Sequence, residues 1–250
     1  MTVRVVIMVV ATLALAIAAG AASGQTVAPG ADNPAPFGSP VDDEHIWAHG
    51  LLDQFEARVQ GADTSLRWDG EAWLGPDDWR LWLRSEGELT HGQVTDGQSE
   101  LLLSKPISTY VDLLVGGRYD LDSLPGQGWG ALGVDWLAPG FVKISATAYA
   151  GQGVAGKVKA SFDERLTNRL ILESEGEINL YDQTDRARRV GAGLSDLDAG
   201  LRLRYELARK FAPYIGVSWQ RAFGETAELE RSAGEPADDV RLSVGVRAWF

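Results

Sequence analysis

The last twelve residues of the chain, Asp239 to Phe250 (DVRLSVGVRAWF), alternate between apolar and polar positions. Every second residue from Val240 onward is apolar, and the residues between them are mostly polar or small. A period of two places these sets on opposite faces of a β-strand. Strands of about ten residues with one apolar and one polar face build transmembrane β-barrels. A soluble β-sandwich could also end on such a strand, so the interpretation depends on whether the unit recurs.

The unit recurs along most of the chain, with turn residues between the segments. In the tenth segment, for example, Leu201 and Leu203 alternate with Arg202 and Arg204. Twelve segments are predicted as strands, at 51–60, 64–74, 78–90, 98–105, 109–120, 128–138, 141–150, 153–163, 168–181, 195–207, 212–223 and 239–250.

The predicted connections differ in length between the two ends of the barrel. If the first strand runs outward, the periplasmic connections are all short, whereas the outer ones are mostly longer and include 91–97, 121–127, 182–194 and 224–238. Outer-membrane barrels have an even number of strands, short periplasmic turns and longer external loops. The pattern therefore predicts an all-β fold, a transmembrane antiparallel β-barrel of about twelve strands spanning residues 51–250. Its expected location is the cell outer membrane, with the lipid bilayer as its surroundings.

The chain before the barrel divides into two predicted parts. Residues 1–24 combine Arg4, an apolar run and a zone of small residues, which is typical of a secretory signal peptide. Residues 25–50 contain several Pro, Gly and Asn residues and show no periodicity, so a short disordered periplasmic lead-in is expected there.

Composition and charge exclude several classes of function. The chain contains no Cys, which removes disulfides and thiolate chemistry. Its net charge of −12 makes nucleic-acid binding a poor hypothesis, because such binding neutralises phosphates. No His lies inside a predicted strand and no GxSxG motif is present, so we do not expect an enzyme.

Charged residues on the polar faces of the strands are expected inside the barrel. Glu173, Glu175 and Glu177 are predicted to face Arg202 and Arg204 across one hairpin. Such charges could serve transport, or they could fill and rigidify the interior.

Glu86 and Glu88 also project inward if Leu81 and Leu83 face lipid. They could line an ion path, or they could merely hydrate the lumen.

Several stretches resemble copper resistance protein B, a family of outer-membrane proteins of Gram-negative copper-resistance systems. The resemblance runs in order through residues 51–250 and is carried by WDGEAWLGPDDWRLWLRSEGE, LTNRLIL, GLSDLDAGLRLRYE, FAPYIGVSW and the terminal GVRAWF. It implies an outer-membrane barrel that binds copper ions and contributes to copper homeostasis and metal tolerance. A periplasmic copper-carrying protein is the partner that such a role suggests.

One departure from the family bears on the metal ligands. Members commonly carry a Met- and His-rich segment before the barrel, which suits Cu(I). Here Met1 and Met8, the two methionines of the chain, both lie in the predicted signal. Any copper site would therefore use imidazole and carboxylate groups, which suit Cu(II) better.

His45 and His49 are the candidate copper ligands, with Asp43 and Glu44 beside them. On a helical turn, residues four apart share a face and could bind one ion. The alternative is that they are two solvated polar residues on a flexible lead-in. His91, in a predicted external loop, is a weaker candidate that is better explained as an ordinary loop residue.

The expected function is copper binding and copper resistance at the outer membrane, by periplasmic capture or export of copper. The alternative is a narrow passive pore or structural barrel that has lost copper binding. Convergent His and carboxylate groups at the periplasmic mouth would favour the first hypothesis. An interior closed by Arg–Glu pairs without a metal cage would favour the second.

Overall fold

The computed structural model describes residues 45–61, 63–122 and 125–250, and contains twelve strands and one helix in these ranges. Residues 1–44 lie outside this description, and with them the predicted signal peptide, most of the lead-in, Asp43 and Glu44. The elements are β1 (Trp47–Gln60), β2 (Asp63–Gly75), β3 (Arg80–Thr90), β4 (Gln93–Ser108), β5 (Val111–Asp120), β6 (Gly128–Ala138), β7 (Val142–Ala150), β8 (Val154–Arg165), β9 (Leu170–Tyr181), β10 (Gly193–Tyr205), β11 (Phe211–Ala222), α2 (Gly224–Ser232) and β12 (Asp238–Trp249).

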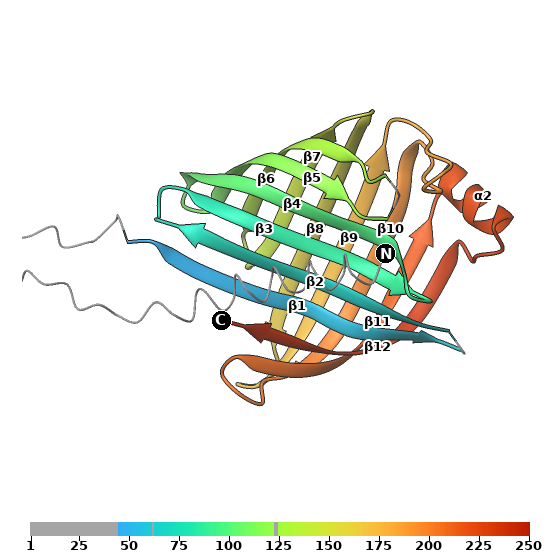
Figure 1. Ribbon diagram of the computed structural model, residues 1–250. Coiled ribbons are helices and arrows are strands. Elements are labelled where there is room, and N and C mark those ends of the chain that lie inside the picture. The colour runs from blue at the N-terminus through green and yellow to red at the C-terminus, as the bar shows by residue number, and fades with distance from the viewer. Residues whose placement is uncertain (1–44, 62, 123–124) are drawn as a thin grey trace, which may run out of the picture.

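All twelve strands form one closed antiparallel barrel, as the alternation predicted (Figure 1). Each strand pairs with its neighbours in sequence, and β1 closes the barrel by pairing with β12, for example at Leu51 and Trp249. The start of β1 and the C-terminus lie at one end of the barrel, and α2 lies at the other (Figure 1). We call these ends the terminal rim and the loop rim.

The two faces of the sheet differ in chemistry. Large apolar side chains such as Leu132, Ile215 and Leu242 remain more than half exposed on the exterior. The interior buries charged residues instead, among them Glu56, Arg58 and Arg202. An apolar exterior around a polar interior is the arrangement of a barrel surrounded by lipid. In the described ranges, no helix has the length and apolar character needed to cross a bilayer.

The first strand begins earlier than predicted. Residues 47–50 were assigned to a disordered lead-in that ended at residue 50, but they belong to β1. Trp47 pairs with Gly75, and Gly50 exchanges backbone hydrogen bonds with Phe250. Pairing on both sides thus orders a stretch whose own composition carries little strand signal.

Two connections at the loop rim differ from their predicted form. The predicted loop at 91–97 is a two-residue turn, because β4 already begins at Gln93. His91 and Gly92 both have positive φ, 52° and 78°, as hairpin turns of this length require. The predicted connection at 224–238 contains the unexpected helix α2, which packs against β10 and β11.

Candidate functional site in the barrel lumen

A cavity of about 910 Å³ occupies the half of the lumen next to the terminal rim. His49 and Trp249 lie at its mouth, and Asp69, Glu175 and Lys159 lie at its inner end. The volume is near the top of the range of roughly 300–1,000 Å³ that is usual for ligand sites. This cavity, which we call the vestibule, can therefore admit ions or a short chain segment.

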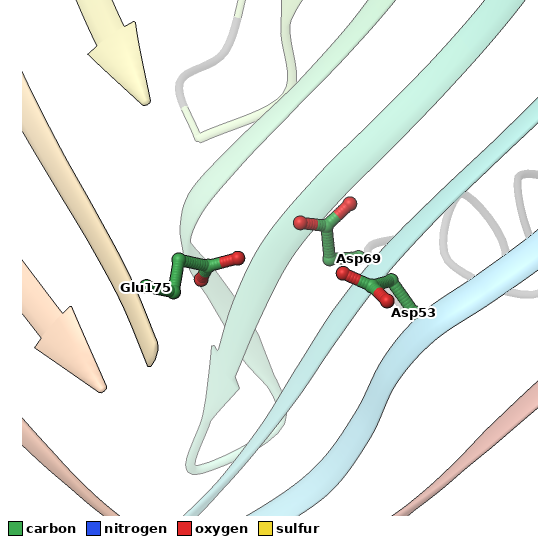
Figure 2. A group of neighbouring side chains, drawn as sticks. All are labelled: Asp53, Asp69 and Glu175. Atoms are coloured by element: carbon green, nitrogen blue, oxygen red, sulfur yellow. The ribbon is translucent and has the colours of Figure 1, made fainter. Parts of the chain in front are cut away.

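Three carboxylates meet at the inner end of the vestibule. Asp53 on β1, Asp69 on β2 and Glu175 on β9 each offer an oxygen within 4.8 Å of the others. Figure 2 shows Asp53 beside Asp69, with Glu175 pointing toward them from the opposite wall. A separation of 4.8 Å is about twice a calcium–oxygen bond length, so one cation could contact all three groups. We call this group the carboxylate triad.

A β-bulge turns Asp53 into the lumen. The register of β1 shifts between Leu52 and Gln54 against β2, and between Leu52 and Phe55 against β12. Asp53 is the extra residue, so two consecutive polar side chains, Asp53 and Gln54, both face inward. Bulges commonly re-aim a side chain in this way near functional sites.

Protein cations already neutralise the triad. The Lys159 ammonium on β8 pairs with Asp69 and lies 3.2 Å from Glu175 Oε2. Arg247 Nε lies 3.0 Å from Asp53 Oδ1. The geometry is suited to holding a cation, but in this conformation lysine and arginine side chains supply the positive charge. An added ion would have to displace Lys159.

Beyond the triad, buried ion pairs fill the lumen. Arg58 contacts Glu56 at 2.7 Å and Asp198 at 3.1 Å, which links β1 to β10. Arg202 reaches Glu56 from the other side at 3.1 Å. The side chains of Arg58, Glu56 and Arg202 are at most 3% exposed. This group, together with the buried Arg67, forms an arginine plug whose side chains oppose the passage of an ion by filling the lumen.

The loop rim is covered by a loop and a helix. Arg188, from the connection between β9 and β10, inserts into the mouth and contacts Asp120 and Asp122 at 3.1 and 2.8 Å. On α2, the Thr226 hydroxyl oxygen accepts a hydrogen bond of 2.8 Å from the Gly191 backbone N–H. These contacts fasten the loop and the helix together over this end of the lumen.

One acid on α2 has a shifted protonation equilibrium. Burial raises the pKa of Glu230 to about 7, and the negative charges of Asp196 and Glu235 act in the same direction. Both the neutral and the charged form of Glu230 are therefore populated in the folded helix near neutral pH.

The structure separates the predicted ligands at the terminal rim. His45 precedes β1 and its ring lies 4.5 Å from that of Trp47, whereas His49 is inside β1 with its ring 6.0 Å from that of Trp73. The expectation of a helical turn is therefore wrong. Four residues of extended chain span about 13 Å, so the two imidazoles cannot share an ion as helical neighbours would. His49 lines the vestibule, and His91 lies far away at the loop rim.

The predicted pairing of three glutamates on β9 with two arginines on β10 is partly rearranged. Glu173 and Glu175 contact Arg202 at 3.6 and 3.5 Å, and Glu173 also pairs with Arg204. Glu177 was expected to face an arginine, but the register places it opposite Asp198. Its partner is Lys157 on β8, at 3.1 Å, because the other neighbouring strand supplies the nearest positive charge.

The inward carboxylates predicted on β3 also contact distant strands. Glu86 pairs with Lys157 across the lumen, and Glu88 lies 2.5 Å from Arg241 and 3.7 Å from Arg58. Glu86 lines the vestibule, whereas Glu88 belongs to the filled part of the interior. Both therefore form ion pairs across the lumen, Glu86 at the wall of the vestibule and Glu88 in the filled part.

Asp53, Asp69 and Lys159 were not identified from the sequence. Consecutive polar residues at Asp53 and Gln54 interrupt the alternation of β1, and this was the available sign of a bulge. Contacts across the lumen, such as Lys159 with Asp69, depend on barrel closure and leave no local pattern in the sequence.

The fold and the lumen define a class of protein. A closed twelve-stranded barrel with an apolar exterior and charged interior is a transmembrane barrel of the porin type. The NanC porin has a similar fold, with a TM-score of 0.52 over 80% of this chain and 98% of NanC. Its sequence identity is 10%, so this likeness concerns the fold alone.

The family is more specific than the class. Residues 46–250 match the family model described as copper resistance protein B precursor, and the chain belongs to the copper resistance protein B family. The copper resistance protein B homolog of Pseudomonas syringae pv. tomato is 39% identical over 85% of this chain and 73% of its own length. Copper resistance protein B of Escherichia coli is 37% identical over 88% of this chain and 76% of its own length. These relationships support a role in copper resistance.

Proposed function

We propose that the protein contributes to copper tolerance at the outer membrane by holding Cu(II) on the periplasmic side of a blocked lumen. In this proposal the terminal rim faces the periplasm, where short turns are expected. Copper would be the cargo of the vestibule rather than a resident cofactor. A periplasmic copper-carrying protein would be the source of the ion.

The observation that carries the proposal is the position of the vestibule relative to the plug. The vestibule lies on the side of His49 and ends at the carboxylate triad, beyond which Arg58 and Arg202 fill the lumen. An ion entering from the terminal rim meets imidazole and carboxylate groups before it meets the buried ion pairs that fill the lumen. This order favours capture over conduction.

The two ligand types have separate roles in this proposal. Carboxylates alone suit hard cations, whereas imidazole favours copper among biologically common divalent ions. His49 would therefore provide the preference for Cu(II). The acidic triad would raise the local cation concentration inside the vestibule.

The alternative is a structural barrel without a copper role. The closure of the interior by Arg–Glu pairs favours it, as does the occupation of the triad by Lys159. A closed interior also argues against a passive pore. Metal binding by the purified protein discriminates between these functions.

The test is titration of the purified mature protein with Cu(II) and, under reducing conditions, with Cu(I). We expect about one equivalent of Cu(II) to bind, and the affinity to fall at least roughly tenfold in a His45→Ala/His49→Ala variant. His91→Ala is the matched control, because it removes the remaining histidine of the chain at the opposite rim.

Other results would change the assignment. Unchanged binding in the double variant would move the site into the barrel, and an Asp69→Asn/Glu175→Gln variant would then test the triad. If the wild-type protein binds neither ion above background, copper capture is wrong and the structural barrel stands.

A further inference from the structure

The opening of the lumen at the loop rim is covered by a segment with a fixed shape. This segment is the connection between β9 and β10, residues 182–192, which we call the rim loop. Within it, Asp185 and Val190 exchange backbone hydrogen bonds of 2.8 and 2.9 Å. The Asp185 carboxylate also accepts a hydrogen bond of 3.0 Å from the backbone N–H of Ala187. Arg188 therefore lies at the tip of a small hairpin that local hydrogen bonds already hold in shape.

The rim loop reaches across the opening to the end of β5. Nε and Nη2 of Arg188 donate hydrogen bonds of 2.9 and 2.8 Å to Asp122 Oδ2, and Nη1 lies 3.1 Å from Asp120 Oδ2. Gln127 adds a hydrogen bond of 3.1 Å from its side-chain amide to Asp185. The strands β6, β7 and β8 lie between β5 and β9 in the wall. The contact therefore spans part of the opening rather than joining neighbouring strands.

The carboxylate that receives Arg188 is fixed on the barrel wall. Asp120 is fully buried and is held by Arg118 Nε at 2.6 Å and by the indole N–H of Trp129 at 2.8 Å. The side chain of Arg188 is itself only 5% exposed. Separating such a pair inside the protein would leave two charges without partners, which is costly. Arg188 can therefore leave Asp120 only when the rim loop moves out and water enters.

Helix α2 holds the rim loop near both of its ends. At one end, the Thr226 hydroxyl oxygen accepts a hydrogen bond of 2.8 Å from the backbone N–H of Gly191. A Cβ atom at Gly191 would lie 2.4 Å from the Thr226 backbone nitrogen, so the loop backbone rests directly on the first turn of the helix. At the other end, the Thr184 hydroxyl donates a hydrogen bond to the Glu225 carboxylate. The loop therefore cannot swing outward unless α2 releases it.

The junction between the rim loop and β10 is suited to act as a pivot. Gly193 has a φ of 94°, and a Cβ atom at this position would meet nothing within 4 Å. Packing therefore does not oppose a backbone rotation there. The start of the loop is tied down instead, because Asp182 and Val154 are joined by backbone and side-chain hydrogen bonds of 2.9 and 2.8 Å. Hinge motions are commonly absorbed by a few residues at the ends of elements.

We propose that the rim loop is a gate at this end of the lumen and that α2 is the fastener that keeps it closed. While the helix holds the loop, Arg188 stays on Asp120 and Asp122 and the end is shut. When α2 loosens, the loop turns about Gly193 and opens the lumen as far as the arginine plug. The gate does not depend on the proposed copper function, because these residues lie outside the lining of the vestibule.

Distances between two spin labels in the full mature protein test the gate. The chain has no Cys, so two introduced Cys residues carry the labels alone. Ala187→Cys places one label on the exposed tip of the rim loop, and Gly128→Cys places the other at the start of β6, where a Cβ atom has open space. Pulsed electron paramagnetic resonance then gives the distribution of distances across the opening.

The deciding variant is Thr226→Val, which keeps a β-branched side chain and removes the hydroxyl that holds the loop. Its matched control is Glu228→Gln, on the exposed face of the same helix. Arg188→Gln removes the contact across the opening. Heat-modifiable gel mobility verifies that each variant forms the barrel.

We expect one narrow distribution in the parent protein and in the Glu228→Gln control. Thr226→Val and Arg188→Gln should each show a severalfold larger population at longer distance. Thr226 contacts the rim loop and not β5, so its effect would show that the helix acts through the loop. A parent distribution in either variant, a control that responds as strongly as Thr226→Val, or a predominantly long distance in the parent itself would each overturn the proposal.

Discussion

At the scale of single residues, the lumen is organised by charges that water cannot reach. Glu56 accepts contacts from Arg58 and Arg202, and the side chains of all three are at most 3% exposed. Buried pairs of this kind are not strongly stabilising overall, because both partners lose hydration. Removal of one partner is costly, however, since it leaves the other charge buried and unpaired.

Glu56→Gln should therefore lower the free energy of unfolding by about 3 kcal/mol, because two buried guanidinium groups lose their shared carboxylate. Urea unfolding of the barrel in lipid vesicles measures the change. Glu164→Gln is the control: Glu164 is exposed near the end of β8, and its replacement should change stability by less than about 0.5 kcal/mol. A loss no larger than that of the control would show that the plug is hydrated.

At the scale of elements, α2 is the part of the fold whose stability should depend most directly on pH. Burial raises the pKa of Glu230 to about 7, above its ordinary value of 4.5. Folding of the helix therefore takes up a proton between these two values. Stability is greatest at low pH and is lost as the pH rises from 4.5 through 7.

Limited proteolysis within residues 223–237 tests this dependence, with wild-type protein and Glu230→Gln compared at the same pH. We expect equal cleavage rates at pH 5. At pH 8 the wild-type rate should be roughly two- to tenfold higher, a modest factor because solvent screens a half-exposed group. Glu228→Gln, on the exposed face of α2, should follow the wild type. A constant ratio between wild type and Glu230→Gln would contradict the raised pKa.

The elements also show what the sequence could and could not predict. Alternation located all twelve strands, because a barrel wall exposes one face to lipid and the other to a polar lumen. It did not reveal the bulge at Asp53, because a break in the alternation can also mean that the strand register was misjudged. It did not reveal the helix that begins at Gly224 either, because so short a helix resembles a loop in the sequence. The partner of Glu177 was mistaken because the nearest cation lies on β8 rather than on the predicted hairpin.

At the scale of the whole molecule, the lumen is open toward the terminal rim and filled toward the loop rim. The vestibule and the plug follow one another along the barrel axis. The strands therefore enclose a lumen as in a porin, but side chains block this lumen over part of its length. The sequence predicted charges inside the barrel but could not predict where they leave a cavity. That division depends on which side chains meet across the lumen.

In planar bilayers we expect the wild-type protein to conduct ions far less than an open porin of the same strand number. Arg67→Ala should raise cation conductance severalfold, because Arg67 is buried in the plug and, within the described residues, has no carboxylate in ion-pair range. Its loss removes volume and the positive charge that faces Asp198, Glu86 and Asp96, and it also removes the hydrogen bond that Arg67 Nε donates to Gln54. Porin-like conductance of the wild type, or no change in the variant, would show that the plug does not control passage.

The pairing of β1 with β12 has a consequence for how the protein is made. Leu51 and Trp249 become neighbours although almost the entire chain separates them, and the contact of Arg247 with Asp53 forms at the same seam. Neither can exist while the C-terminal strand is still being synthesised. A chain without that strand would present unpaired backbone edges to lipid, which the bilayer does not tolerate. Assembly is thus tied to the presence of β12, and the inner end of the vestibule takes shape at the step in which β1 and β12 pair.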